Sequence, residues 1–250
     1  MRPVRICSLE QFGTPTPARR RGRVIALVRG SQPHAGSLTH GYGGIWIVAE
    51  IEECWARVMA WLAANAQASY VTLNPPATPA ELDACERELR IALPAELRRL
   101  LLVSNGAADF DAAGTYHPEA EFLPGGDRLL PAAEVASTSR AHVETAAEFG
   151  DDLIGSWWHP QWVMFGKHIS GCGVAIDQRP GPGQGAVGEF MKEGGTEFTT
   201  SASLGEYVAQ LADSIENGTD ILRWFEDGFL RYRPYVDEDG RLAWRVIGEE

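Results

Sequence analysis

From residue 51 onward, apolar residues recur at steps of three and four, the spacing that places them on one face of an α-helix. The members of this first stripe are Ile51, Cys54, Trp55, Val58 and Leu62. Glu50, Glu52 and Glu53 surround the first turn, where the helix dipole favours negative charge. The pattern therefore predicts an amphipathic helix that begins at Ile51.

The segment from Thr78 to Gly106 predicts two more amphipathic helices. Thr78 suits an N-cap, and Pro79 suits the first helical position, where its missing N–H costs nothing. A second helix is expected to start at Pro94 and to end in a left-handed conformation at Asn105-Gly106. The apolar positions that define the two faces are Leu82, Cys85 and Leu89, then Leu97, Leu100 and Leu101.

After Gly106 the pattern changes to short apolar runs bounded by glycine or proline, which is typical of antiparallel strands. Strands are expected at residues 121–123, 128–130, 162–165, 173–177 and 187–191. A helix is expected over 131–149, and another follows a cap at Ser201 or Ser203 and ends at Asn217-Gly218. The order of elements predicts an α+β fold.

Residues 218–250 are expected to add a small helical piece around 221–225 and a terminal hairpin. The hairpin strands are predicted at 230–235 and 242–247, with the turn at Asp239-Gly240. The chain thus divides into an extension (1–47), a helix with a linker (48–77), a central domain (78–217) and this C-terminal extension.

Charge is distributed unevenly along the 250 residues. The net charge is −12, yet residues 1–47 hold seven arginines against the single acid Glu10. This +6 segment lacks periodicity and is expected to be a dispensable tail or a wrongly extended translation start before Val48. The remainder carries −18, which argues against nucleic acid as a partner.

Cysteine spacing and hydropathy indicate the compartment. Cys7, Cys54, Cys85 and Cys172 form no CxxC motif, and two of them lie on apolar helix faces, as reduced buried thiols do. No apolar run approaches the roughly 20 residues that cross a bilayer. A cytoplasmic protein without a membrane partner is expected.

Several of these features together resemble the SUKH superfamily. They are the Leu93-Pro94 step, Asn105-Gly106, the FLPGGDRLLPAAEV element from Phe122, WHPQWVMFG from Trp158 and GVAIDQRPGPGQ from Gly173. This superfamily includes the yeast Smi/Knr cell-wall regulators and many bacterial immunity proteins. The resemblance covers about residues 78–217 and implies a non-enzymatic, protein-binding domain without cofactor or metal.

The resemblance favours an immunity-type protein that binds and neutralises a toxin domain, and the acidic body favours a basic toxin. A cytoplasmic regulatory adaptor of the same fold is the alternative. A hydrolase in which Cys172 and His168 act as thiolate and base is a third reading, disfavoured because the sequence shows no convergent acid–base set. A metal site made of His159, His168, Cys172 and Asp177 matches no standard zinc spacing.

A partner-binding surface is expected around a tryptophan-rich stretch. Trp157, Trp158 and Trp162 lie close together, and at least one is expected to close the core while an outward one anchors a partner. Asp151 and Asp152 would give this surface an acidic rim. Asp177 is expected to form an Asx-turn with Arg179 at the end of its strand.

Overall fold

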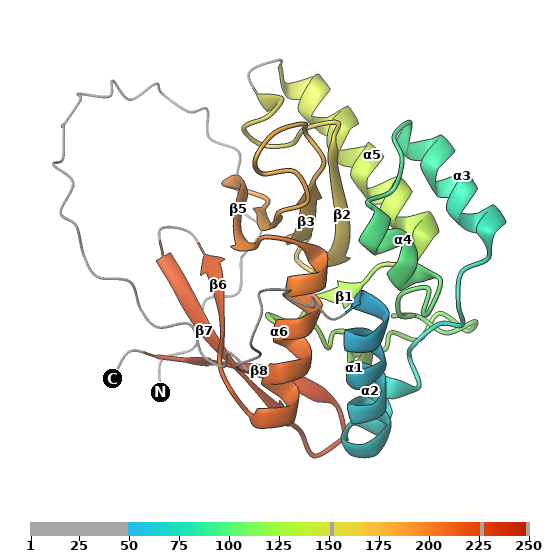
Figure 1. The fold of residues 1–250 in the computed structure, drawn as a ribbon, viewed down its shortest axis with the longest axis vertical. Helices are drawn as coiled ribbons and strands as arrows, with labels where there is room; N and C mark the ends of the chain where they lie inside the picture. Colours follow the sequence, from blue (N-terminus) through green and yellow to red (C-terminus); the bar gives the residue numbers. More distant parts are fainter. Residues whose placement is uncertain (1–49, 151–152, 226–227, 249–250) are drawn as a thin grey trace, which may run out of the picture. The chain divides into compact units, whose positions relative to one another are not determined.

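The computed structural model describes residues 50–150, 153–225 and 228–248 (Figure 1). The expected extension at 1–47 lies outside these residues. The described helices are α1 (Ile51–Asn65), α2 (Gln67–Tyr70), α3 (Pro79–Leu89), α4 (Ala95–Leu101), a 3-10 turn (Pro118–Ala120), α5 (Ala132–Phe149) and α6 (Leu204–Asn217). None of them is long and apolar enough to cross a bilayer.

Two antiparallel sheets accompany these helices, so the chain has the predicted α+β fold. The first sheet is a meander of β1 (Arg128–Leu129), β2 (Trp162–Lys167), β3 (Gly173–Asp177), β4 (Val187–Met191) and β5 (Gly195–Ser201). The second sheet has the order β6 (Ile221–Phe225), β7 (Gly228–Val236) and β8 (Leu242–Ile247).

Two pairs of helices, α3 with α5 and α1 with α6, pack against these sheets. α5 packs against α3 and β2, whereas α6 packs against α1 and reaches both β5 and the second sheet. Figure 1 shows α5 beside the strands of the first sheet, and α6 below these strands and alongside α1. The largest side chains that are fully buried between these layers are Trp55, Trp158, Trp162, Phe122, Phe165 and Phe190.

The predicted helix signals are mostly confirmed. Every apolar position of the α1 stripe is buried, as are all five apolar positions on one face of α6. Thr78 and Glu81 form a reciprocal capping box: the Thr78 hydroxyl accepts from the Glu81 N–H, and the Glu81 carboxylate accepts from the Thr78 N–H. Ser203 caps α6, and Gly218 ends it in the left-handed conformation.

Asn105-Gly106 has a different role from the predicted one. α4 already ends at Leu101, and Gly106 adopts its positive φ of 70° further along the chain. The Asn105 side chain instead accepts a hydrogen bond from the Ala132 N–H at 2.8 Å, at the start of α5. A Cβ on Gly106 would lie 2.5 Å from the Leu130 carbonyl carbon, so the pair joins two segments rather than ending a helix.

The observed strands differ from the predicted elements at three places. Residues 121–123 form no strand, because Leu123 and Asp127 close a tight turn around Pro124–Gly126. β5 was not predicted, since Phe198 is its single large apolar residue and its other positions are Gly, Thr, Glu and Ser. Residues 221–225 are strand β6 and not a helix, and the hairpin that follows is confirmed.

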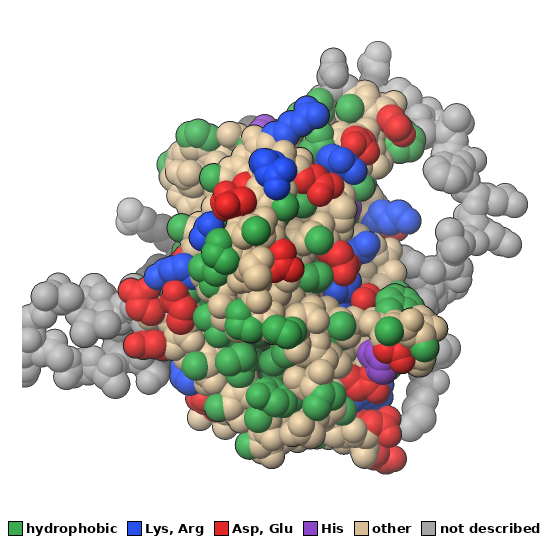
Figure 2. Space-filling view, turned by 90° about the vertical axis from the view of Figure 1, so that its right-hand side faces the viewer, with side chains coloured by type: hydrophobic (Ala, Val, Ile, Leu, Met, Phe, Trp, Pro, Cys, Tyr) green, Lys and Arg blue, Asp and Glu red, His purple; other side chains and the backbone are tan. Residues whose placement is uncertain are grey.

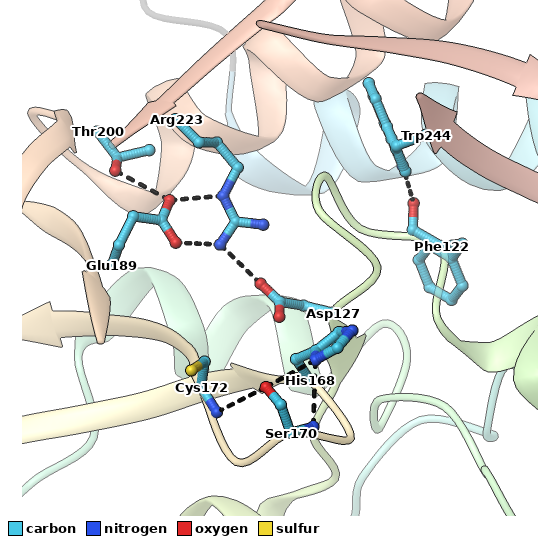
Figure 3. Close-up of polar contacts among 9 residues, drawn as sticks. All are labelled: Phe122, Asp127, His168, Ser170, Cys172, Glu189, Thr200, Arg223 and Trp244. Atoms are coloured by element: carbon cyan, nitrogen blue, oxygen red, sulfur yellow. Dashed lines mark hydrogen bonds and ion pairs between the residues drawn. The ribbon is translucent and has the colours of Figure 1, made fainter. Parts of the chain in front are cut away.

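The C-terminal sheet is joined to the start of the described chain. The Leu242 N–H donates to the Ser69 hydroxyl at 3.1 Å, and the Ala68 N–H donates to the Gly240 carbonyl at 3.1 Å. The Trp244 indole N–H donates to the Phe122 carbonyl at 2.9 Å (Figure 3). Residues 219–248 are therefore part of the same packed unit as α1 and α2.

Candidate functional site

The tryptophan-rich stretch lies mostly inside the molecule. Trp158 is 0% exposed and Trp162 is 2% exposed, so the expectation that at least one tryptophan closes the core is confirmed, and neither of these two is the outward tryptophan that would anchor a partner. Trp157 is half-buried, and its indole N–H donates to the Lys192 carbonyl at 2.7 Å. Asp151 and Asp152 lie outside the described residues, so the acidic rim stays a prediction.

An aromatic cluster explains why the two tryptophans are buried. The rings of Trp158 and Phe190 meet edge to face with centroids 5.2 Å apart, and the His142 ring lies 4.7 Å from the Trp158 ring. Burial lowers the pKa of His142, which hydrogen-bonds the Thr138 carbonyl at 2.8 Å. The cluster joins α5 to β4 as core packing.

His168 and Cys172 share a turn but form no catalytic pair. The His168 Nδ1 contacts the Ser170 hydroxyl at 2.8 Å and accepts from the Ser170 N–H at 3.1 Å. Within the described part of the chain, no hydrogen bond joins the Cys172 thiol to His168. Figure 3 shows the sulfur pointing away from the imidazole. The Nδ1 atom of His168 is thus engaged by the turn itself, and the thiol does not face the ring.

The metal-ligand candidates are not assembled either. Among the described residues, no group of three His, Cys, Asp or Glu side chains is placed to hold an ion. Asp177 makes the predicted Asx-turn, accepting from the Arg179 N–H at 2.9 Å, and also pairs with the Arg179 guanidinium at 2.7 Å. That guanidinium lies 5.0 Å from the centre of the Trp162 ring, so it closes over the core.

A buried ion cluster lies where the two sheets meet, and the sequence patterns did not indicate it. Arg223 of β6 donates through Nε to Glu189 of β4 at 2.6 Å, and its Nη2 reaches both Glu189 and Asp127, the latter at 2.8 Å (Figure 3). The Thr200 hydroxyl donates to the Glu189 carboxylate at 3.1 Å. All three charged residues are less than a tenth exposed.

Two carboxylates share one guanidinium in this cluster. Burial raises the pKa of the Glu189 carboxyl; Arg223 opposes this rise and Asp127 adds to it. The pKa of Arg223 is held well above its usual value by the two carboxylates, although burial acts against this. Because every charged member is enclosed and paired, the cluster joins the sheets and presents no reactive group to solvent.

An exposed apolar surface lies on the side of the molecule that carries α1 to α4. Figure 2 shows hydrophobic side chains gathered on the lower part of this face, below a region of mixed charge. Residues 66–80 contain no charged residue. Val71 is 68% exposed and Phe110 is 56% exposed. We call the following set the apolar surface: Tyr70, Val71, Pro75, Pro76, Leu102 and Phe110.

Backbone hydrogen bonds hold the two segments of the apolar surface side by side. Leu73 and Ala107 form an antiparallel bridge, and the Ala108 N–H donates to the Thr72 carbonyl at 2.9 Å. Further along, the Asn105 N–H donates to the Pro75 carbonyl at 3.1 Å. The apolar side chains therefore project from two backbone segments that are hydrogen-bonded to each other.

The sequence pattern predicts a linker before Thr78, places Leu102 in the helix expected to end at Asn105-Gly106, and assigns the residues after Gly106 to strands and turns, so it does not indicate this surface. A usable signal was present, namely a charge-free run that contains Tyr70, Val71 and two prolines. The signal is weak because only the fold shows that residues 100–110, which are also poor in charge, lie beside this run.

Comparisons with known proteins agree with this architecture. The sequence matches the SMI1 / KNR4 family (SUKH-1) over residues 76–210, more than half of the chain. It is also 28% identical over 200 residues to the cell wall biosynthesis/cell cycle regulator smi1 of Schizosaccharomyces pombe, which covers 71% of this chain. The chain spans about 38% of the length of that relative. The resemblance to the SUKH superfamily is thus confirmed, and the chain belongs to the SMI1/KNR4 family.

Proposed function

We propose that this chain is a non-catalytic protein-binding domain whose partner covers the apolar surface. The observation that carries the proposal is the exposure of Val71 and Phe110 on two segments that are hydrogen-bonded to each other, the first of which contains no charged residue. Contiguous apolar patches on soluble domains mark sites of protein association. Because the backbone of both segments is already hydrogen-bonded, little ordering cost opposes binding.

The partner we propose is a toxin domain that the chain neutralises by covering it. The superfamily resemblance supports this role, since immunity proteins act by binding. The charge of −18 on residues 48–250 supports a basic partner, because long-range attraction accelerates the encounter of opposite charges. Asp151 and Asp152 are proposed to contribute to this attraction. The on-rate is then expected to fall as salt rises.

A regulatory adaptor is the second candidate function. The similarity to a cell wall and cell cycle regulator over 200 residues favours it. Both functions need a protein-binding surface and differ in what happens to the partner: a neutralised toxin loses its activity, whereas the partner of an adaptor keeps it.

The experiment compares two matched double variants of the full chain in its own cells. Val71→Asp with Phe110→Asp alters the apolar surface, whereas Ile169→Asp with Phe149→Asp alters two side chains of similar exposure elsewhere, 69% and 67%. Proteins that co-purify with a tagged chain are identified, and their affinity is then measured with purified components. The first variant should weaken binding by about a hundredfold or more, and the second should bind as the wild type does.

Equal binding by both variants would place the interface elsewhere. The role is decided by expressing the identified partner alone and together with the chain. Rescue of growth or loss of the partner's activity supports neutralisation, whereas an unchanged partner activity supports the adaptor.

A further inference from the structure

The second sheet has one face against the core and an opposite face that exposes apolar side chains and arginines to solvent. Alternate residues of a strand point to opposite faces. Ile221, Arg223 and Leu242 are buried on the core side. On the opposite side, Leu222 is 52% exposed and Phe229 is 57% exposed. We call this outer side the arginine face, made of Leu222, Trp224, Phe229, Arg231, Arg233, Tyr235, Arg245 and Ile247.

Three arginines are concentrated on this face. Arg233 pairs with Asp220 at 2.6 Å. Within the residues that the structure describes, Arg231 and Arg245 form no ion pair with a carboxylate. The Arg245 guanidinium lies 4.6 Å from the centre of the Tyr235 ring, a cation–π contact that holds it over this neighbouring side chain. A guanidinium held in this way keeps N–H groups available for a carboxylate.

The strand register makes this concentration of charge costly for the isolated chain. Arg233 of β7 is the direct cross-strand partner of Arg245 of β8. Like charges directly opposite each other destabilise a sheet. The chain carries a net charge of −12, so this face is opposite in sign to the protein as a whole. An anionic group placed over the two arginines would relieve their repulsion.

Apolar side chains are interleaved with the charges. In the register of the sheet, Arg231 lies between Leu222 of β6 and Ile247 of β8. Phe229 follows beside Trp224 at the end of the same face. A ligand that covers the face must therefore offer carboxylates and apolar side chains in close alternation. An acidic segment of a protein has this chemistry.

We propose that the arginine face binds an acidic, partly apolar segment of a partner protein. Carboxylates pair with Arg231 and Arg245, and apolar side chains pack on Leu222 and Phe229. Single-stranded nucleic acid would also meet arginines and aromatic rings. Because the aliphatic side chains of Leu222 and Ile247 lie on either side of Arg231, the face matches apolar side chains beside carboxylates better than a phosphate backbone, and for this reason we favour the protein segment. This face lies beyond residues 76–210 and is separate from the apolar surface, so the proposal stands apart from the proposed function.

The test uses the full chain and a fluorescein-labelled peptide that alternates glutamate and leucine. A peptide with glutamine in place of glutamate and a single-stranded oligothymidylate serve as comparison probes. The glutamate peptide should bind saturably, and at least about tenfold more tightly than either of the others. No saturable binding of the glutamate peptide, equal binding of the glutamine peptide, or tighter binding of the oligothymidylate would overturn the proposal.

Two variants with the same change of net charge locate the site. Arg231→Glu with Arg245→Glu should weaken binding of the glutamate peptide by at least about tenfold. Arg87→Glu with Arg90→Glu, at the end of α3, should leave it unchanged. The thermal midpoint of the first variant should not fall, since Arg245→Glu replaces a repulsion across from Arg233 by an attraction. Equal loss of binding in the two variants would mean that only overall charge matters and would reject the site.

Discussion

The five-stranded sheet and the three-stranded sheet meet the core with different side chains. The central strands of the first sheet present almost unbroken apolar runs, such as Val163, Met164 and Phe165, all at most 1% exposed. The second sheet presents a few apolar residues and Arg223, whose charge is matched by Glu189 and Asp127. One sheet is thus held by apolar packing, and the other is held in addition by a buried ion cluster.

The difference indicates that the two kinds of contact have different roles: one stabilises the fold, and the other fixes the position of a strand. Apolar packing tolerates small shifts, because most hydrophobic neighbours of similar size are acceptable. The buried guanidinium of Arg223 must lie within hydrogen-bonding distance of both Glu189 and Asp127. Removal of either partner leaves an unpaired charge in the interior. We infer that the ion cluster fixes the position of β6 against β4, while apolar packing such as that of the aromatic cluster stabilises the first sheet.

Trp158→Ala should give the largest loss of stability. Truncation of a fully buried tryptophan removes its apolar contacts and leaves a cavity, at a cost of about 3–5 kcal/mol in the free energy of unfolding. Urea unfolding followed by circular dichroism measures this loss. Trp157→Ala, next to it but half-buried, should cost clearly less. Equal costs would show that the aromatic cluster is not the centre of the first sheet's core.

Arg223→Met should cost about 3–5 kcal/mol at neutral pH, because two carboxylates remain buried without their partner. Unlike the tryptophan variant, its loss should depend on pH. Burial already raises the pKa of Glu189, and removal of Arg223 raises it further. An acid whose pKa is raised by folding stabilises the protein while protonated, and this stabilisation disappears as pH rises through the folded-state pKa.

The stability difference between wild type and Arg223→Met should therefore shrink from about pH 8 to about pH 5. Arg233→Met, on the exposed side of the same sheet, is the matched control and should cost at most about 1 kcal/mol. A loss for Arg223→Met that is independent of pH would mean that Glu189 is not left as a buried carboxylate.

Trp244→Phe should cost about 1 kcal/mol, since it removes the hydrogen bond from the indole to the Phe122 carbonyl. Trp224→Phe, on the opposite side of the same sheet, breaks no hydrogen bond that the structure describes and should be nearly neutral. Chemical denaturation of both variants measures the difference. If the two were equal, this hydrogen bond would not contribute to holding β8 against the first part of the domain.

The smallest effect is expected for a chain that starts at Val48, which changes neither sheet. Its thermal midpoint should stay within a few degrees of that of the full chain, because residues 1–47 lack the hydrophobic periodicity of packed elements. Scanning calorimetry of both chains is sufficient. A midpoint lower by about ten degrees would show that residues before Val48 stabilise the folded unit.

Most of the fold follows from local patterns, and the exceptions have a common cause. The stripes of α1 and α6 and the capping box at Thr78 depend on neighbours within one or two turns, so the sequence predicts them. β5 and β6 were not predicted as strands, because the residues that suit their core-facing positions depend on contacts with segments distant in the sequence. Arg223 interrupts an apolar run, and no rule of periodicity assigns an arginine to a core strand until Glu189 and Asp127 are known to lie there.

The candidate surfaces depend even more on the three-dimensional fold. Trp158 and Trp162 could be predicted to be interfacial or buried, and only the packing against Phe190 and Arg179 decides between these alternatives. The apolar surface arises because a bridge between Leu73 and Ala107 brings a predicted linker beside residues that follow the helix expected to end at Asn105-Gly106. The arginine face depends on the cross-strand register of Arg233 and Arg245, which the sequence does not state.

The contacts between β8 and the α1–α2 junction have a consequence for the newly made chain. Leu242 closes on Ser69 across most of the described sequence, and Glu189 and Asp127 receive Arg223 only after β6 has formed. Contacts between positions that are distant in the sequence form late in folding, because closing the long loop between them costs conformational entropy. While the ribosome still holds residues 219–248, the nascent chain therefore carries unpaired acids and open apolar surface. Release of β8 from the ribosome is the earliest moment at which this unit can finish folding.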